Sequence, residues 1–229
     1  MFLLFLSNLV ERNSLFFYIL FILLYKLGRQ RRLEQEEIIL FTSKVSYYYP
    51  SDHKAFKNFQ KDLKRKILTQ RKKNQPLVIV CIGTDRATGD CLGPLVGQYL
   101  QHNTSYFSVY GCLSHPVHAQ NLTETIRHIY QLHTDPFIIA IDACLGCTEH
   151  IGYITLSNMP LLPGQGVSKK LPPIGNISIT GIVNTFSDFN EEKIQNTRLH
   201  TVVKLASFIS SAIETSFPLI YPTSYRRIL

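Results

Sequence analysis

The chain has 229 residues, of which 45% are hydrophobic and 17% charged, a globular composition that argues against long disordered regions. Its formal net charge of +8 is uneven. Residues 1–75 carry 15 basic and 6 acidic side chains and residues 76–229 carry 9 and 10, which disfavours a dedicated DNA-binding fold. The 5 cysteines, an odd number, do not read as a disulfide framework and indicate a reducing compartment. We therefore expect a cytoplasmic protein.

The first 40 residues differ from the rest of the chain. Their longest apolar run, 15–25, is short, because a transmembrane helix needs about 20 residues. Positive charges follow this run instead of preceding it, so a secretory signal fits poorly. Two alternatives stay open for residues 1–40: an extension that associates with the membrane through residues 15–28, or a spurious stretch outside the working protein. We expect the folded domain to cover residues 45–225.

From residue 51 onward, helical and extended patterns alternate. Apolar residues at spacings of three and four predict an amphipathic helix over 51–70, with Ser51 or Asp52 as its N-cap and a basic outer face. Continuous apolar runs predict buried parallel strands at 76–83 and 136–143. The other predicted elements are strands at 106–111, 150–157 (at or near a sheet edge) and 177–183, and helices at 92–101, 119–133 and 191–217.

This alternation predicts an α/β fold, a three-layer α/β/α sandwich with a mostly parallel central sheet. Right-handed crossovers place the strand at 76–83 between those at 106–111 and 136–143. In open α/β sheets, ligands bind beyond the carboxyl ends of the strands. We therefore expect the functional site where these strands end.

Carboxylates follow two of these strands. The loop CIGTDRATGDCLGP at 81–94 holds Asp85 and Asp90, and Asp142 lies at the end of the third strand. The predicted strand order brings Asp90 and Asp142 side by side. Two such carboxylates can share one proton and activate a water molecule. Simpler roles stay open: Asp90 as a helix cap and Asp142 in an Asx turn.

Other polar residues precede the helix at 119–133 or share the first loop. His115 and His118 lie where an imidazole could reach the same crevice, although His118 also fits a satisfied, half-buried histidine. With Asp90 and Asp142, His118 is a candidate metal ligand. Arg86 could steady an oxyanion, and a solvent-facing role is the alternative.

A short cysteine motif follows the third strand. Cys144 and Cys147 form C-L-G-C, and His150 follows three residues later. Structural zinc takes four ligands, and no second C-x-x-C or H-x-x-x-H completes the set. Two small residues in a turn are the simpler interpretation.

Five segments, taken in order, resemble the YyaC family of sporulation proteins from spore-forming bacteria. The resemblance runs over about 45–225 and rests on GTDRATGDCLGPLVG, PVHAQNL, IDACLG, PGQGVSKKLPPIGNISITGIVN and QNTRL. That family is similar in fold to the germination protease of spores and to the hydrogenase maturation proteases. The resemblance implies their phosphorylase/hydrolase-like α/β sandwich.

Two of these motifs match motifs that hold catalytic residues in the germination protease. TGDCLGP is similar to the T-P-D-A-L-G-P motif of the germination protease, which implies a catalytic role for Asp90. IDACLG is similar to its D-A-L motif, which implies the same for Asp142. In the hydrogenase maturation proteases these two positions bind nickel or act as metal ligands. The resemblance therefore makes zinc or nickel a candidate, although no cofactor is required.

These observations favour an endopeptidase that uses Asp90 and Asp142, with Asp85, Arg86 and His118 as candidate supporting residues. Its partner would be a protein or peptide of the spore or forespore. A non-catalytic peptide- or ligand-binding module and a phosphoryl- or glycosyl-handling enzyme are the alternatives. The basic stretch at 61–73 could attract an acidic substrate or contact nucleic acid or an anionic membrane.

Overall fold

The computed structural model describes residues 45–102, 106–163, 171–187 and 190–220. The predicted extension over residues 1–40, with its membrane association through 15–28, lies outside these ranges. Among the described helices, none is both long and apolar enough to cross a membrane.

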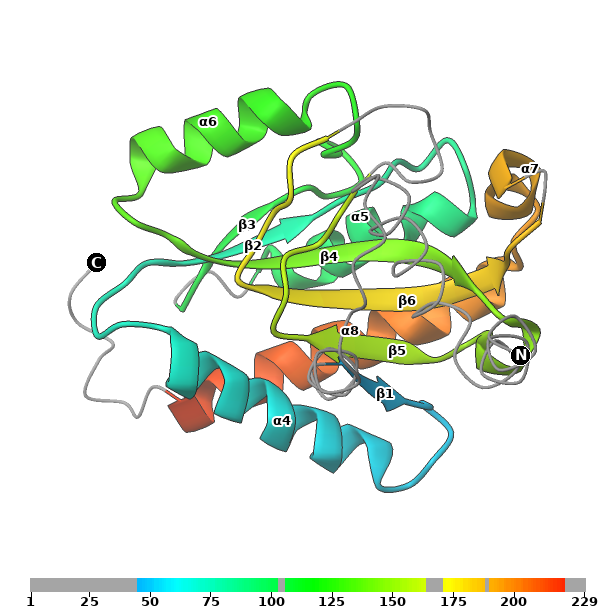
Figure 1. The fold of residues 1–229 in the computed structure, drawn as a ribbon, viewed down its shortest axis with the longest axis horizontal. Coiled ribbons are helices and arrows are strands. Elements are labelled where there is room, and N and C mark those ends of the chain that lie inside the picture. The colour runs from blue at the N-terminus through cyan, green and yellow to red at the C-terminus, as the bar shows by residue number, and fades with distance from the viewer. Residues whose placement is uncertain (1–44, 103–105, 164–170, 188–189, 221–229) are drawn as a thin grey trace, which may run out of the picture.

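A mostly parallel sheet forms the centre of the molecule (Figure 1). The four strands from β6 to β3 are parallel, β5 is antiparallel to β6, and β1 is antiparallel to β5. In spatial order the strands are β1 (Val45–Tyr48), β5 (Ile154–Ser157), β6 (Ile177–Thr185), β4 (Phe137–Gly146), β2 (Leu77–Cys81) and β3 (Ser108–Tyr110). The predicted order around β2 and the near-edge strand at 150–157 are both confirmed.

Helices cover both faces of the sheet, so the predicted α/β/α sandwich is confirmed (Figure 1). Residues of α4, α5 and α8 pack on one face, and α6 packs on the other. The described helices are α4 (Ala55–Gln70), α5 (Leu92–Leu100), α6 (Leu122–Leu132), α7 (Asn190–Gln195) and α8 (Leu199–Ile220), with 3-10 turns η1 (Gly89–Cys91) and η2 (Thr148–His150).

The larger core lies under α4 and α8. Phe59 of α4 is fully buried, and its ring packs edge to face with those of Tyr48 and Phe208 at centroid distances of 5.1 and 5.7 Å. Strand residues such as Ile79 and Ile139 complete the same cluster. Burial of these apolar side chains holds the helices on the sheet.

Three details differ from the sequence prediction. Strand β1 was not predicted. The first helix begins at Ala55 without a side-chain cap, so the predicted Ser51 or Asp52 N-cap is wrong; the Asp52 carboxylate instead accepts the Lys54 backbone N–H at 2.9 Å in the preceding turn. The helix predicted over 191–217 is two helices.

The break between α7 and α8 has a clear cause. The Asn184 side chain at the end of β6 donates from Nδ2 to the carbonyl oxygen of Lys193 at 2.9 Å, and Thr197 Oγ1 donates to the same oxygen at 2.8 Å. These side chains satisfy a helix-terminal carbonyl, which ends α7 before α8 begins.

Candidate functional site

The candidate site lies where β2 ends beside β4. Cys81, the last residue of β2, pairs in parallel with Ile141, and Asp142 is the next residue of β4, which continues to Gly146. After β2 the chain turns at Gly83, where φ is 136°. A Cβ atom at this position would lie 2.0 Å from the carbonyl oxygen of Asp90. Only glycine therefore permits the loop to fold back and hold Asp90 over the strand end.

Asp90 belongs to η1, and its side chain accepts a hydrogen bond from the backbone of the loop that follows β2. Its Oδ2 accepts the backbone N–H of Thr84 at 2.8 Å. The following helix α5 has Cys91 as its N-cap residue, with no side-chain capping bond. The interpretation of Asp90 as a cap of this helix is therefore wrong. The half-buried carboxylate is held beside the strand ends.

Asp142 lies within β4, opposite Thr180 of β6. Its Oδ1 accepts the backbone N–H of Ala143 at 2.8 Å. Because β4 continues to Gly146, the side chain does not form the Asx turn considered for the loop after it. Asp142 is half-buried on the face of the sheet that α6 partly covers.

The two carboxyl groups influence each other. Burial raises the pKa of Asp142 well above its ordinary value, and the charge of Asp90 raises it further. Burial also raises the pKa of Asp90, but the Thr84 N–H and the nearby His118 oppose this rise. Because a charge on one carboxyl disfavours a second charge beside it, the pair holds one proton over a range of pH.

His118 lies within electrostatic reach of Asp90, as predicted from its loop. Its Nδ1 accepts the Gln120 backbone N–H at 3.3 Å. The carbonyl oxygen of Val117 accepts the N–H of Gly83 at 2.8 Å. This bond ties the histidine loop to the aspartate loop.

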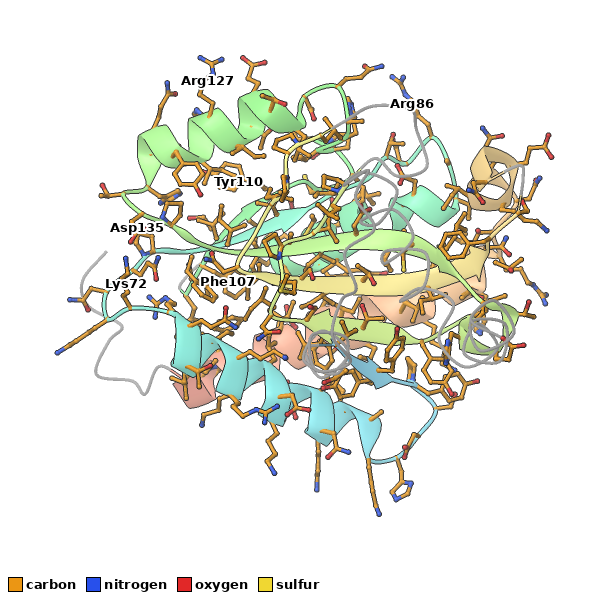
Figure 2. All side chains as sticks on the ribbon, viewed as in Figure 1. Lys72, Arg86, Phe107, Tyr110, Arg127 and Asp135 are labelled. Carbon is orange, nitrogen blue, oxygen red and sulfur yellow. The ribbon has the colours of Figure 1, made fainter. Side chains whose placement is uncertain are left out.

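The other predicted loop residues lie further out. Asp85 and Arg86 are exposed, and Figure 2 shows Arg86 at the outer margin of the molecule. His115 is also exposed, and its Nδ1 lies 3.0 Å from Ser114 Oγ. Their supporting roles stay predictions.

A metal site was predicted from Asp90, Asp142 and His118. Within the part of the chain that the structure describes, no three His, Cys, Asp or Glu side chains form a group suited to holding a metal ion. Zinc or nickel at this site stays a prediction.

A row of polar side chains beside Asp142 was missed by sequence reasoning. Thr180 Oγ1 lies 2.6 Å from Thr155 Oγ1 of β5 and accepts the Cys144 thiol at 3.3 Å. The alternating patterns ISITGIV and HIGYITLS carry the signal, because they place both threonines on the more polar sides of their strands.

The two cysteines of C-L-G-C have different partners. Cys144 lies within β4, and burial raises its pKa to about 12. Cys147 follows the strand, and its Sγ lies 2.9 Å from Nδ1 of His150. The interpretation as two residues in one turn is wrong for Cys144, because β4 extends to Gly146.

The basic helix α4 bears most of its cations on its exposed side, as expected. Arg65 pairs with Asp62 at 2.8 Å, and Lys72 beyond the helix pairs with Asp135 at 2.8 Å (Figure 2). Lys66 is the departure, because it is buried and its pKa is lowered mainly by that burial. Contact of residues 61–73 with nucleic acid or membrane stays a prediction.

Known proteins match the same part of the chain. Residues 47–212 match the family model described as a protein of unknown function, DUF1256. Protein YyaC of Bacillus subtilis (strain 168) is 44% identical over 168 residues, which cover 73% of this chain and 81% of that protein. Among solved structures, the NiFe hydrogenase maturation protease HycI from Thermococcus kodakarensis is similar, with 17% identity and a TM-score of 0.38 over 67% of this chain and 99% of that chain.

Proposed function

The chain belongs to the DUF1256 family, which is the family of YyaC, and we propose that it is an endopeptidase in which Asp90 and Asp142 activate a water molecule. The observation that carries the proposal is the pair of half-buried carboxyl groups, of which the charge of Asp90 raises the pKa of Asp142. Carboxyl groups in this state supply a base and an acid at the same pH.

The proposed reaction uses one water molecule. The ionised Asp90 takes a proton from the water molecule while the water oxygen bonds to the peptide carbonyl carbon. Asp142, protonated, gives its proton to the carbonyl oxygen. When the tetrahedral intermediate collapses, the C–N bond breaks, Asp142 regains its proton from the hydroxyl group, and Asp90 passes its proton to the leaving amine. Both residues return to their starting states.

His118 acts as a positioning residue in this proposal. Its interaction with Asp90 lowers the pKa of that carboxyl against the effect of burial. The histidine therefore helps to keep Asp90 ionised while Asp142 holds the proton.

The similarity of TGDCLGP and IDACLG to the germination protease motifs supports peptide hydrolysis over other water-dependent reactions. We assign the substrate to proteins of the spore or forespore on the same basis. The negative charge of Asp90 at the start of α5 disfavours a phosphoryl-handling enzyme, because it would repel a phosphate.

Digestion of spore-extract protein by the purified chain, read by mass spectrometry, tests the proposal. We expect discrete cleavage products that disappear with Asp90→Asn and with Asp142→Asn. Asp135→Asn, an exposed carboxyl that precedes the other end of β4, is the matched control and should cleave normally. Parallel reactions with added zinc or nickel show whether a metal contributes.

If no variant and no condition gives cleavage while all proteins show the same far-UV circular dichroism, the peptidase proposal is wrong. The non-catalytic binding module would then be the better interpretation, and capture of peptides on the immobilised chain would be the next measurement.

A further inference from the structure

A groove lies beside the candidate site at the edge of the sheet. It has a volume of about 890 Å³ and lies between the end of the sheet at β3 and helix α6. Its lining residues come mainly from β3, the loop after β3 and α6, and they include Tyr110, Val117, His118, Arg127, His128 and Gln131. Figure 2 shows Tyr110 on the strand beneath α6 and Arg127 on the helix itself.

One wall of this groove is an unpaired strand edge. β3 pairs with β2 from Ser108 to Tyr110, and it is the last strand of the sheet on that side. No other strand of the described ranges pairs with its outer edge. An edge strand presents backbone N–H and C=O groups that can pair with an extended peptide.

The groove lies beside the loop that holds Asp90. Val117 and His118 line the groove, and the carbonyl oxygen of Val117 accepts the N–H of Gly83 at 2.8 Å, next to Thr84, whose N–H binds the Asp90 carboxylate. A chain lying along β3 toward His118 would therefore approach the loop of Asp90.

The chemistry of the lining suits a polypeptide. Arg127 and Glu124 form an ion pair at 3.4 Å and offset each other's charge. Most other polar lining groups are imidazole and amide side chains, such as His128 and Gln131, which both donate and accept hydrogen bonds. A nucleic acid would require an excess of cations instead.

We propose that this groove binds the substrate as an extended, polar polypeptide segment that pairs with the free edge of β3. The segment continues beyond His118, so that the peptide bond to be cleaved lies next to Asp90. This inference rests on the proposed peptidase function for the cleavage, but the binding step can be measured without it. Backbone pairing would provide affinity with little dependence on sequence, and the groove side chains would select polar residues.

The test uses the full chain with both Asp90→Asn and Asp142→Asn, so that no probe is cut. The probe is a fluorescein-labelled library of twelve-residue peptides made from Ser, Thr, Asn, Gln, Glu and Ala, followed by fluorescence anisotropy. We expect binding that weakens by less than threefold between 50 and 300 mM salt. The same library with alternate backbone nitrogens methylated should bind at least tenfold more weakly, because it cannot pair with a strand edge.

Two neighbouring residues of α6 provide a matched pair of variants. Gln131 lines the groove, whereas Tyr130 is 57% exposed and does not. Gln131→Trp should fill the groove and weaken binding at least tenfold, and Tyr130→Trp should leave it unchanged. The inference is overturned if the library does not bind, if both variants bind equally, or if methylated peptides bind as well as the parent library.

The two proposals can fail separately. Cleavage of spore proteins that is equally fast in Gln131→Trp and in the unmodified chain would reject the groove while leaving the peptidase intact. Groove-dependent binding without any cleavage would keep the groove and reject the peptidase.

Discussion

The charge of the Asp90 carboxylate raises the pKa of Asp142, which burial has already raised well above its ordinary value. The two groups come from different elements, η1 and β4, and both are half-buried near the carboxyl end of β2. Folding thus places two like charges close together, which is unfavourable for stability unless one group stays protonated.

The first prediction concerns stability and pH. A carboxyl whose pKa is raised on folding favours the folded state fully below its unfolded pKa, and this advantage is lost as pH rises through the folded pKa. Asp142→Asn keeps an acceptor for the Ala143 N–H but removes this titration. We expect its melting temperature at pH 7 to be a few degrees higher, since about 1 kcal/mol shifts Tm by ~2–4 °C in chains of this size.

Calorimetry from pH 4 to pH 8 provides the check, with the exposed Asp85→Asn as control. The gain for Asp142→Asn should grow with pH. A lower melting temperature than the unmodified chain at pH 7 would contradict the raised pKa.

The second prediction concerns the pH dependence of cleavage. Activity should fall at low pH as Asp90 becomes protonated and fall again at high pH as Asp142 loses its proton. His118→Gln removes an interaction that lowers the pKa of Asp90, so the acidic limb of kcat/KM should move to higher pH. A profile that is scaled down without moving would show that His118 has only a structural role.

The third prediction concerns the loop that holds Asp90. Gly83→Ala introduces a Cβ 2.0 Å from the Asp90 carbonyl oxygen at a φ of 136°, whereas Gly152→Ala, at a φ of 86°, meets only the Tyr49 ring at 3.7 Å. Urea unfolding should show a loss of about 3 kcal/mol or more for Gly83→Ala and about 1 kcal/mol for Gly152→Ala. Equal losses would mean that backbone conformation, and not the contact with Asp90, determines the effect.

The fourth prediction concerns thiol reactivity. Cys147 has an imidazole 2.9 Å from its sulfur, while burial raises the pKa of Cys144 to about 12. Iodoacetamide at pH 7 should therefore modify Cys147 well before Cys144, as read by peptide mass mapping. His150→Ala should slow the reaction of Cys147 severalfold, and an unchanged rate would show that the imidazole does not activate this thiol.

The fifth prediction concerns the core beneath α4. Phe59→Ala removes a fully buried ring that contacts Tyr48 and Phe208, and it should lower the free energy of unfolding by about 3–5 kcal/mol. Leu68→Ala on the same helix, where the side chain is 58% exposed, should change it by less than about 0.5 kcal/mol. Similar values for the two variants would place the main core elsewhere.

The sequence by itself determined the centre of the sheet and its family. The apolar runs at 76–83 and 136–143 are typical of parallel strands buried on both faces, because their side chains alternate between two covered surfaces. With right-handed crossovers, the neighbours of β2 and the meeting of Asp90 with Asp142 followed. The motifs around these aspartates led to the YyaC family, which the 44% identity confirms.

Only the tertiary structure decided the remaining features, because each depends on contacts between distant parts of the chain. β1 has four residues, and its strand pairing is with β5, more than a hundred residues away. Asn184 of β6 helps to end α7 through its hydrogen bond to the Lys193 carbonyl oxygen, and no local sequence pattern predicts that bond. The groove beside β3 and the raised pKa values of Asp90 and Asp142 likewise exist only after folding, since burial and the approach of other elements create them.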